Sequence, residues 1–97
     1  MTELKFERKI NTQKVANGNG AMFICQVPPD SDTKVAWHLN GEQIVNGRSK
    51  RFIIKSDSRG KHIFTIAECT LQDEGSVMCV AENSSGSIQC CANLFVI

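Results

Sequence analysis

The sequence predicts an all-β fold in which two antiparallel sheets stack face to face. Short runs of alternating apolar and polar residues, separated by turn residues, fill the 97-residue chain, and this pattern is typical of half-buried strands. Strands of this kind bury their apolar faces by packing one sheet on another. The length suits one hydrophobic core and is too short for two, so we expect a single domain over residues 1–97.

Eight or nine strands are expected at near-regular spacing, and most of them end at a turn signal. Proline residues end the strand that contains Phe23, because proline cannot donate to a sheet ladder, and Asn-Gly pairs favour tight turns elsewhere. The only helical turn that the sequence favours lies at Thr70 to Glu74. The expected strands are residues 6–10, a short strand around Val15, then 21–25, 35–39, 44–45, 52–54, 63–66, 76–81 and 88–97.

Composition and charge exclude several classes of protein. The chain is 41% hydrophobic and 22% charged, with a net charge of +1 at pH 7, so we expect a soluble globular domain with no general attraction to nucleic acid. No apolar run approaches the roughly 20 residues of a membrane helix, and no membrane association is expected. The first ten residues carry charges that a signal peptide would not have.

Positive charge is concentrated between residues 48 and 62, a stretch that contains six cationic residues and one anionic residue. One interpretation is a solvated sheet face with its turns, as is usual for charge runs. The other is a docking patch for an acidic protein surface such as actin. The candidate residues are Arg48, Lys50, Arg51, Lys55 and Lys61.

Cys25, Trp37 and Cys79 have the spacing of immunoglobulin domains, in which a tryptophan packs on a pair of cysteines from the two sheets. Residues 15–25 resemble the V-x-x-G…A-x-F-x-C opening of I-set domains, and residues 73–86 resemble D-x-G-x-Y-x-C-x-A-x-N-x-x-G. The resemblance implies an I-set immunoglobulin-like Greek-key sandwich. Val77 replaces the family tyrosine, which removes a hydrogen bond worth about 1 kcal/mol. The residues assigned to the core signature are Cys25, Trp37, Leu71, Asp73, Gly75 and Cys79.

Two further cysteines narrow the resemblance. Cys69 and Cys90 fall where cysteines recur in the intracellular muscle immunoglobulin domains of titin, telokin, palladin and obscurin-like proteins. Residues 34–42 and 49–52 also resemble the V-x-W-x-x-x-G…S-x-R-F pattern of those proteins. The resemblance implies a sarcomeric or cytoskeletal chain in the cytoplasm.

Five cysteines are an odd number, so at least one is outside any intramolecular disulfide. Cys25 and Cys79 are the candidate disulfide; their oxidation would close a loop worth roughly 4 kcal/mol on the chain-entropy model. In a reducing compartment they would instead pack as small apolar thiols, and we expect this state. Strand alternation turns Cys90 inward and Cys91 outward, so Cys91 is the candidate exposed thiol.

The pattern predicts no enzyme, no cofactor and no metal site. The only close cysteine pair, Cys90 with Cys91, points to opposite faces of one strand, and His38 and His62 fall on different strands with no second ligand nearby in sequence. No serine lies in a nucleophile motif, and there is no Gly-rich phosphate loop. We therefore expect no catalytic, cofactor-binding or metal-binding residues.

The expected function is a structural and protein-binding module of a larger sarcomeric or cytoskeletal protein. It would act as a mechanical spacer between neighbouring immunoglobulin or fibronectin modules, and would dock proteins along the edges formed by residues 6–10 and 88–97. The alternative is an extracellular adhesion or receptor domain, with an oxidised cysteine pair and a glycan on Asn83 of the Asn-Ser-Ser sequon. Asn83 also matches the turn asparagine of the family motif, and we prefer that structural role.

Overall fold

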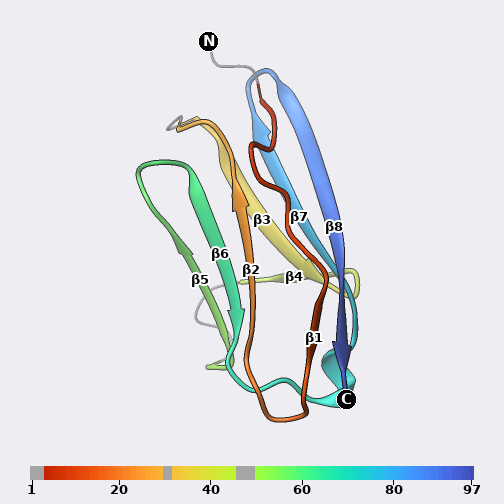
Figure 1. The fold of residues 1–97 in the computed structure, drawn as a ribbon. Helices are drawn as coiled ribbons and strands as arrows, with labels where there is room; N and C mark the ends of the chain where they lie inside the picture. Colours follow the sequence, from red (N-terminus) through yellow and green to blue (C-terminus); the bar gives the residue numbers. More distant parts are fainter. Residues whose placement is uncertain (1–3, 30–31, 46–49) are drawn as a thin grey trace.

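The computed structural model describes residues 4–29, 32–45 and 50–97, which form two layers of strands (Figure 1). One layer is a five-stranded sheet in the order β1-β8-β7-β3-β4, and the other is a three-stranded sheet in the order β2-β6-β5. The strands are β1 (Gln13–Val15), β2 (Ala21–Gln26), β3 (Lys34–Leu39), β4 (Glu42–Ile44), β5 (Phe52–Ser56), β6 (Lys61–Ile66), β7 (Gly75–Asn83) and β8 (Gly86–Val96).

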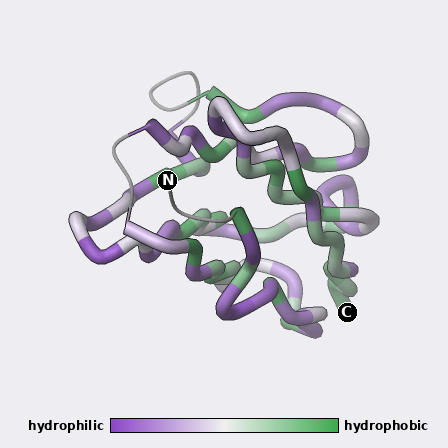
Figure 2. Tube along the Cα trace, turned by 90° about the horizontal axis from the view of Figure 1, so that it is seen from above, coloured by the Kyte–Doolittle hydropathy of each residue, from purple (hydrophilic) through white to green (hydrophobic). Residues whose placement is uncertain are grey.

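The strand pairing confirms the two-sheet immunoglobulin-like sandwich. One of its strand pairs is parallel, whereas only antiparallel pairs were expected. β1 runs parallel to β8, with Gln13 opposite Leu94 and Val15 opposite Val96. All other paired strands are antiparallel. In Figure 2, apolar and polar segments follow one another along the tube, as the sequence alternation requires. No helix in the described part of the chain is both long and apolar enough to cross a membrane.

Two expected strands differ from the structure. Residues 6–10 form no strand; Arg8 makes a single antiparallel bridge to Gln26, after which the chain leaves that sheet and joins β8 through β1. The expected strand 44–45 is instead β4, which ends at Ile44. The Asn-Gly turn expected at residues 46 and 47 lies outside the described residues.

The core is centred on Phe64, which is fully buried on the middle strand of the three-stranded sheet. Its ring lies 5.6 Å from Trp37 in the opposite sheet, 6.2 Å from Phe23 and 5.8 Å from Phe52, measured between centroids. Such offset and tilted aromatic pairs add to the free energy of burial. Trp37 Nε1 is buried without a hydrogen-bond partner among the described residues, so packing alone holds the indole between the sheets.

A buried carboxylate holds the corner between β6 and β7. The 3₁₀ turn η1 (Leu71–Asp73) follows β6, and Asp73 is 4% exposed. Its two oxygens accept hydrogen bonds from Arg51 Nη1 at 2.8 Å and Nη2 at 3.1 Å, and Oδ2 accepts one from the Thr70 backbone at 2.8 Å. This bidentate pair ties the segment before β7 to the start of β5.

Leu71 is a correction to the expected core signature. Its side chain is 63% exposed, whereas the Cys69 side chain is completely buried. The reason is the geometry of η1: the short turn directs Asp73 inward to meet Arg51, and Leu71, at the start of the same turn, then faces solvent. Cys69 supplies the apolar contact at this corner.

Gly75 is required where β7 begins. Its φ is +146°, and a β-carbon there would collide with the Asn40 side chain. Asn40 uses that space to donate to Glu74 O at 3.1 Å and to accept from the Ser76 backbone at 2.9 Å. The absence of a side chain at Gly75 therefore allows the β3–β4 turn to attach to β7.

We expect Asp73→Asn to lower the free energy of unfolding by about 2 kcal/mol at pH 7, because Arg51 would lose a charged partner in a largely enclosed site. Urea denaturation measures this loss. Glu82→Gln, which removes an exposed carboxylate from β7, is the matched control and should change stability by less than about 0.5 kcal/mol.

The Arg51–Asp73 pair also makes the loss of stability in Asp73→Asn depend on pH. Burial alone would raise the pKa of Asp73, but the hydrogen bonds from Arg51 and Thr70 outweigh it and hold that pKa below its usual value. A depressed folded pKa means that the stabilisation is complete above about pH 4 and is lost as the pH falls through the folded value. The stability difference between wild type and Asp73→Asn should therefore narrow below pH 4; a difference that stays constant would refute this assignment.

Candidate functional site

Two thiols meet at the centre of the sandwich. Cys25 on β2 and Cys79 on β7 are both fully buried, and their sulfur atoms lie 3.3 Å apart. Trp37 lies opposite Cys79 in the neighbouring strand, so the structure brings the two cysteines and the tryptophan together. The hydrogen bond with Cys25, together with burial, raises the pKa of the Cys79 thiol, which keeps it protonated and unreactive.

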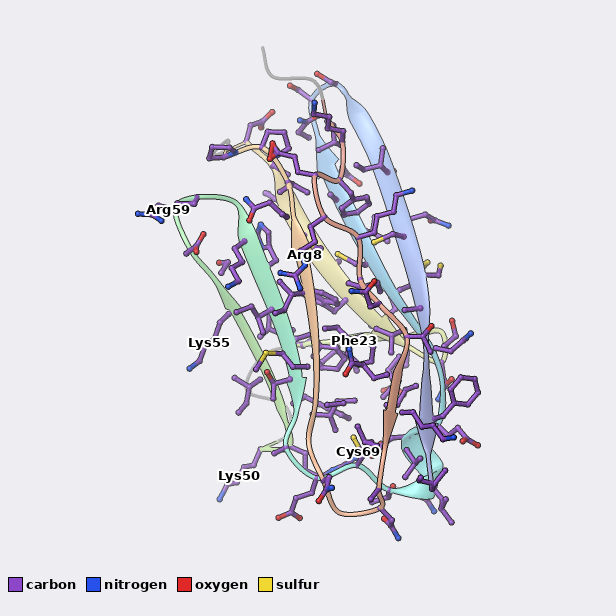
Figure 3. The ribbon with its side chains drawn as sticks, viewed as in Figure 1. Arg8, Phe23, Lys50, Lys55, Arg59 and Cys69 are labelled. Carbon is purple, nitrogen blue, oxygen red and sulfur yellow. The ribbon has the colours of Figure 1, made fainter. Side chains whose placement is uncertain are left out.

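The other three cysteines separate into two buried thiols and one exposed thiol. Cys69 and Cys90 are buried, and burial raises the pKa of both. Figure 3 shows Cys69 between the layers at the lower end of the sandwich. Cys91 is exposed on β8. Reagents in solution therefore reach Cys91 before any other thiol in the chain.

The solvent face of the three-stranded sheet carries cations beside apolar side chains. Strand register places Arg8, Gln26 and Lys61 in one row and Ile24, Ile63 and Lys55 in the next. No carboxylate of the described residues forms an ion pair with Arg8, Lys55 or Lys61. These three charges are therefore available to an acidic partner.

Apolar side chains continue across the same face. Met22 and Ile53 lie in one row on either side of Thr65, and they are 47% and 38% exposed. The outer face of an antiparallel sheet is usually polar, so exposed apolar side chains here need another explanation. A contiguous apolar patch rimmed by charge is the usual composition of a protein-binding surface.

The expected patch of cations is only partly assembled by the fold. Lys55 and Lys61 share the outer face of the β2-β6-β5 sheet, but Arg51 is engaged by Asp73. Lys50 lies at the opposite end of β5 from Arg59, and Lys55 lies between them, so these cations spread along one edge (Figure 3). Arg48 lies outside the described residues.

Arg8 and the apolar rows were not expected as part of this surface. The exposed positions of β2, β5 and β6 alternate with core positions, and this alternation in the sequence could have predicted which of their residues face outward. Only the strand register, however, shows that Arg8 and Lys61 lie on either side of Gln26.

The strands nearest the two ends of the chain lie side by side. β1 and β8 run in the same direction, while the first described residues and the C-terminus lie at opposite ends of the sandwich (Figure 1). Two backbone hydrogen bonds extend this ladder: Ile97 N donates to Val15 O at 2.9 Å, and Asn17 N donates to Ile97 O at 2.7 Å. Tension applied to the two ends would shear these bonds together and would not open them one by one.

The part of β8 that precedes residue 94 has no partner strand on its outer edge in the described chain. β1 pairs only with residues 94–96, and no other strand of the described chain pairs with the outer side of β8. Ile97 N and Asn93 N both point toward the β1 side, so by alternation the backbone groups of residues 87, 89 and 91 point outward. Of the two edges expected for docking, this upper part of β8 is a strand edge, whereas residues 6–10 are not.

The surface hollows near the turns offer little chemistry. One, of about 340 Å³, lies near the β5–β6 turn and is lined by Pro28, Thr33, Asp57 and His62. Burial lowers the pKa of His62 despite the nearby Asp57. The Asp57 carboxylate accepts hydrogen bonds from the backbones of Arg59 and Lys61, so it serves the turn. Among the described residues, no three or more His, Cys, Asp or Glu side chains are placed to hold a metal ion.

Asn83 has a structural role in the β7–β8 turn. Its Oδ1 accepts a hydrogen bond from Ser85 N at 2.8 Å, and its Nδ2 donates to Thr33 Oγ1 at 3.4 Å. The first bond is the local side-chain contact that favours asparagine in turns.

Comparison with known proteins agrees with this geometry. Mouse palladin is 30% identical over 95 residues, which cover 98% of this chain and 7% of palladin. The muscle M-line assembly protein unc-89 of Caenorhabditis elegans is 35% identical over 91 residues, which cover 94% of this chain and 1% of that protein. The chain thus spans a small part of either relative.

The fold matches solved muscle immunoglobulin domains. The crystal structure of a complex of titin M10 with an obscurin-like 1 immunoglobulin domain contains a chain that aligns with a TM-score of 0.87 at 24% identity, over 97% of this chain and 93% of the matched chain. A family model described as the immunoglobulin I-set domain matches residues 4–96. The chain therefore belongs to the immunoglobulin I-set domain family.

Proposed function

We propose that the chain is a structural and protein-binding module of a longer cytoskeletal or sarcomeric protein in the cytoplasm, with no catalytic role. Its relatives include palladin and an M-line assembly protein, in which domains of this size occupy a small share of the length. The module would transmit force along the parent chain between neighbouring immunoglobulin or fibronectin modules. It would bind other proteins through its surfaces.

The parallel pairing of β1 with β8 is the observation that carries the mechanical role. The ladder joins the two terminal strands directly, and tension on the ends loads its hydrogen bonds in parallel. Resistance of this kind needs neither a pocket nor a cofactor. It depends on the short ladder and on the Val15 and Val96 side chains that pack beside it.

The thiol arrangement supports the cytoplasmic assignment. Four of the five cysteines are enclosed and Cys91 is exposed. A free surface thiol is ordinary in a reducing compartment and is a liability in a secreted domain. The central pair, Cys25 and Cys79, would serve there as buried apolar groups.

An acidic filament such as actin is the second candidate partner. Arg8, Lys55 and Lys61, which form no ion pair with the described carboxylates, and the exposed Met22 and Ile53 favour it. An acidic surface would meet positive charge around an apolar centre.

Single-molecule stretching tests the mechanical role. Val15→Pro removes the N–H that faces β8, since Val15 O already accepts from Ile97 on that side, and the unfolding force should fall clearly below that of the wild type. Lys14→Pro is the matched control, because the backbone groups of Lys14 point away from β8. Equal forces for Val15→Pro and wild type would contradict the proposal.

Thiol counting by mass spectrometry tests the compartment. Protein isolated from cytosol without reductant should carry five free thiols, and mild alkylation of the folded state should label Cys91 alone, since the other four thiols are buried. A Cys25–Cys79 disulfide that survives mild reductant would instead favour an extracellular adhesion module. Asn83 would then be examined for glycan.

Co-sedimentation with actin filaments tests the second candidate. The double variant Lys55→Glu with Lys61→Glu should bind about tenfold more weakly than wild type, and wild-type binding should fall steeply with salt. Lys14→Glu with Lys34→Glu, on the other sheet, changes the net charge equally and serves as the control. Binding that is absent, insensitive to salt or equally weakened in both variants would eliminate actin as a partner of this face.

A further inference from the structure

Three side chains with soft or borderline donor atoms line up across the outer face of the five-stranded sheet. Strand register places His38 on β3 directly opposite Met78 on β7, and Met78 directly opposite Cys91 on β8. All three alternate with buried neighbours, so all three project from the solvent face. They are separated by 40 and 13 residues in the chain, which is why no sequence spacing reveals them.

The pairing geometry brings the donors close together. The backbone groups of Cys91 point away from β7, as the positions of Asn93 N and Ile97 N require, so Met78 and Cys91 form a non-hydrogen-bonded pair. In such pairs the side chains are closest, and Cβ atoms of directly opposed residues lie about 4.5–5.5 Å apart. With metal–ligand bonds of about 2.0–2.3 Å, the imidazole and the thiolate can meet at an ion above the central methionine.

The surroundings suit a soft cation. Ala36, Val80 and Gln89 occupy the row on one side, and Ser76 and Asn93 are paired on the other. None of these five residues is charged, so none of them opposes a metal ion and none offers the carboxylate oxygen that Mg²⁺ or Ca²⁺ needs.

We propose that His38, Met78 and Cys91 form a binding site for a soft monovalent metal ion of the Cu(I) class. Thiolate and thioether sulfur select Cu(I), and imidazole also binds copper. The Cys91 thiol loses its proton to solvent on binding, so one thiolate neutralises the single charge of Cu(I), and no electron is transferred. Zn²⁺ fits poorly, because it requires four ligands of which a thioether is not one.

The other thiols do not compete in the folded protein. Cys25, Cys69 and Cys79 are fully buried, and Cys90 is 8% exposed. Met22, which is 47% exposed on the opposite sheet, has no cysteine or histidine beside it in its row and serves as an internal control.

The test is an anaerobic titration of the reduced domain with Cu(I) in competition with a chromophoric chelator. We expect one Cu(I) per chain, loss of binding in Cys91→Ser, and affinity lowered by more than about tenfold in both Met78→Leu and His38→Gln, since even indirect metal partners are worth that much. Met22→Leu should bind as the wild type does. Bound Cu(I) should also protect Cys91 from alkylation.

The wild type provides a readout that needs no variant. In methyl NMR spectra recorded with Ag(I) as a redox-inert substitute, the Met78 methyl signal should shift at one equivalent while the Met22 signal stays in place. The proposal is overturned if the Met78 signal does not move, if Met78→Leu and His38→Gln both bind as wild type, or if Zn²⁺ displaces Cu(I). The first two results would reduce the site to an isolated surface thiol, and the third would show that the site does not select a soft monovalent ion.

Discussion

The packing of Phe64 against Trp37 is the interaction on which the rest of the structure depends. Phe64 lies on the middle strand of one sheet and Trp37 on an inner strand of the other, with ring centroids 5.6 Å apart. Because an antiparallel sheet cannot leave its apolar face in water, this contact sets how the two layers face each other. Cys25 and Cys79 then meet beside the indole. Whether they are oxidised or reduced, they add to a core that the aromatic side chains already define.

The corner at η1 shows how one ion pair changes the function assigned to a residue. Arg51 belongs by sequence to a run of cations suited to docking, but the fold uses it to neutralise Asp73, which is 4% exposed. A buried carboxylate without that partner would carry a large desolvation cost. Among the described residues, Lys55 and Lys61 remain as cations on this face, and a single bridge to Gln26 places Arg8 beside them.

The two outer faces differ in chemistry because different side chains occupy the outward-facing positions of the two sheets. The three-stranded sheet presents Met22 and Ile53 near cations that have no ion-pair partner in the described part of the chain, which suits a protein partner. The five-stranded sheet presents an uncharged centre in which Met78 and Cys91 are neighbours. Neither face interferes with the mechanical ladder, because β1 and β8 meet near the C-terminal end of the sandwich. The β1–β8 ladder, the cations of the three-stranded sheet and the Met78–Cys91 pair therefore lie in different parts of the domain.

The sequence by itself determined the fold class, most of the strands, the core positions Cys25, Trp37 and Cys79, and the exposure of Cys91. These follow from local alternation and from spacing that resembles a known family, and both are properties of neighbouring residues. Only the tertiary structure decided that Leu71 faces solvent, that Arg51 is paired, that residues 6–10 form no strand, and that His38, Met78 and Cys91 share a row. The physical reason is register: a shift of one residue between strands reverses every face, and no local pattern specifies which distant residues lie opposite each other.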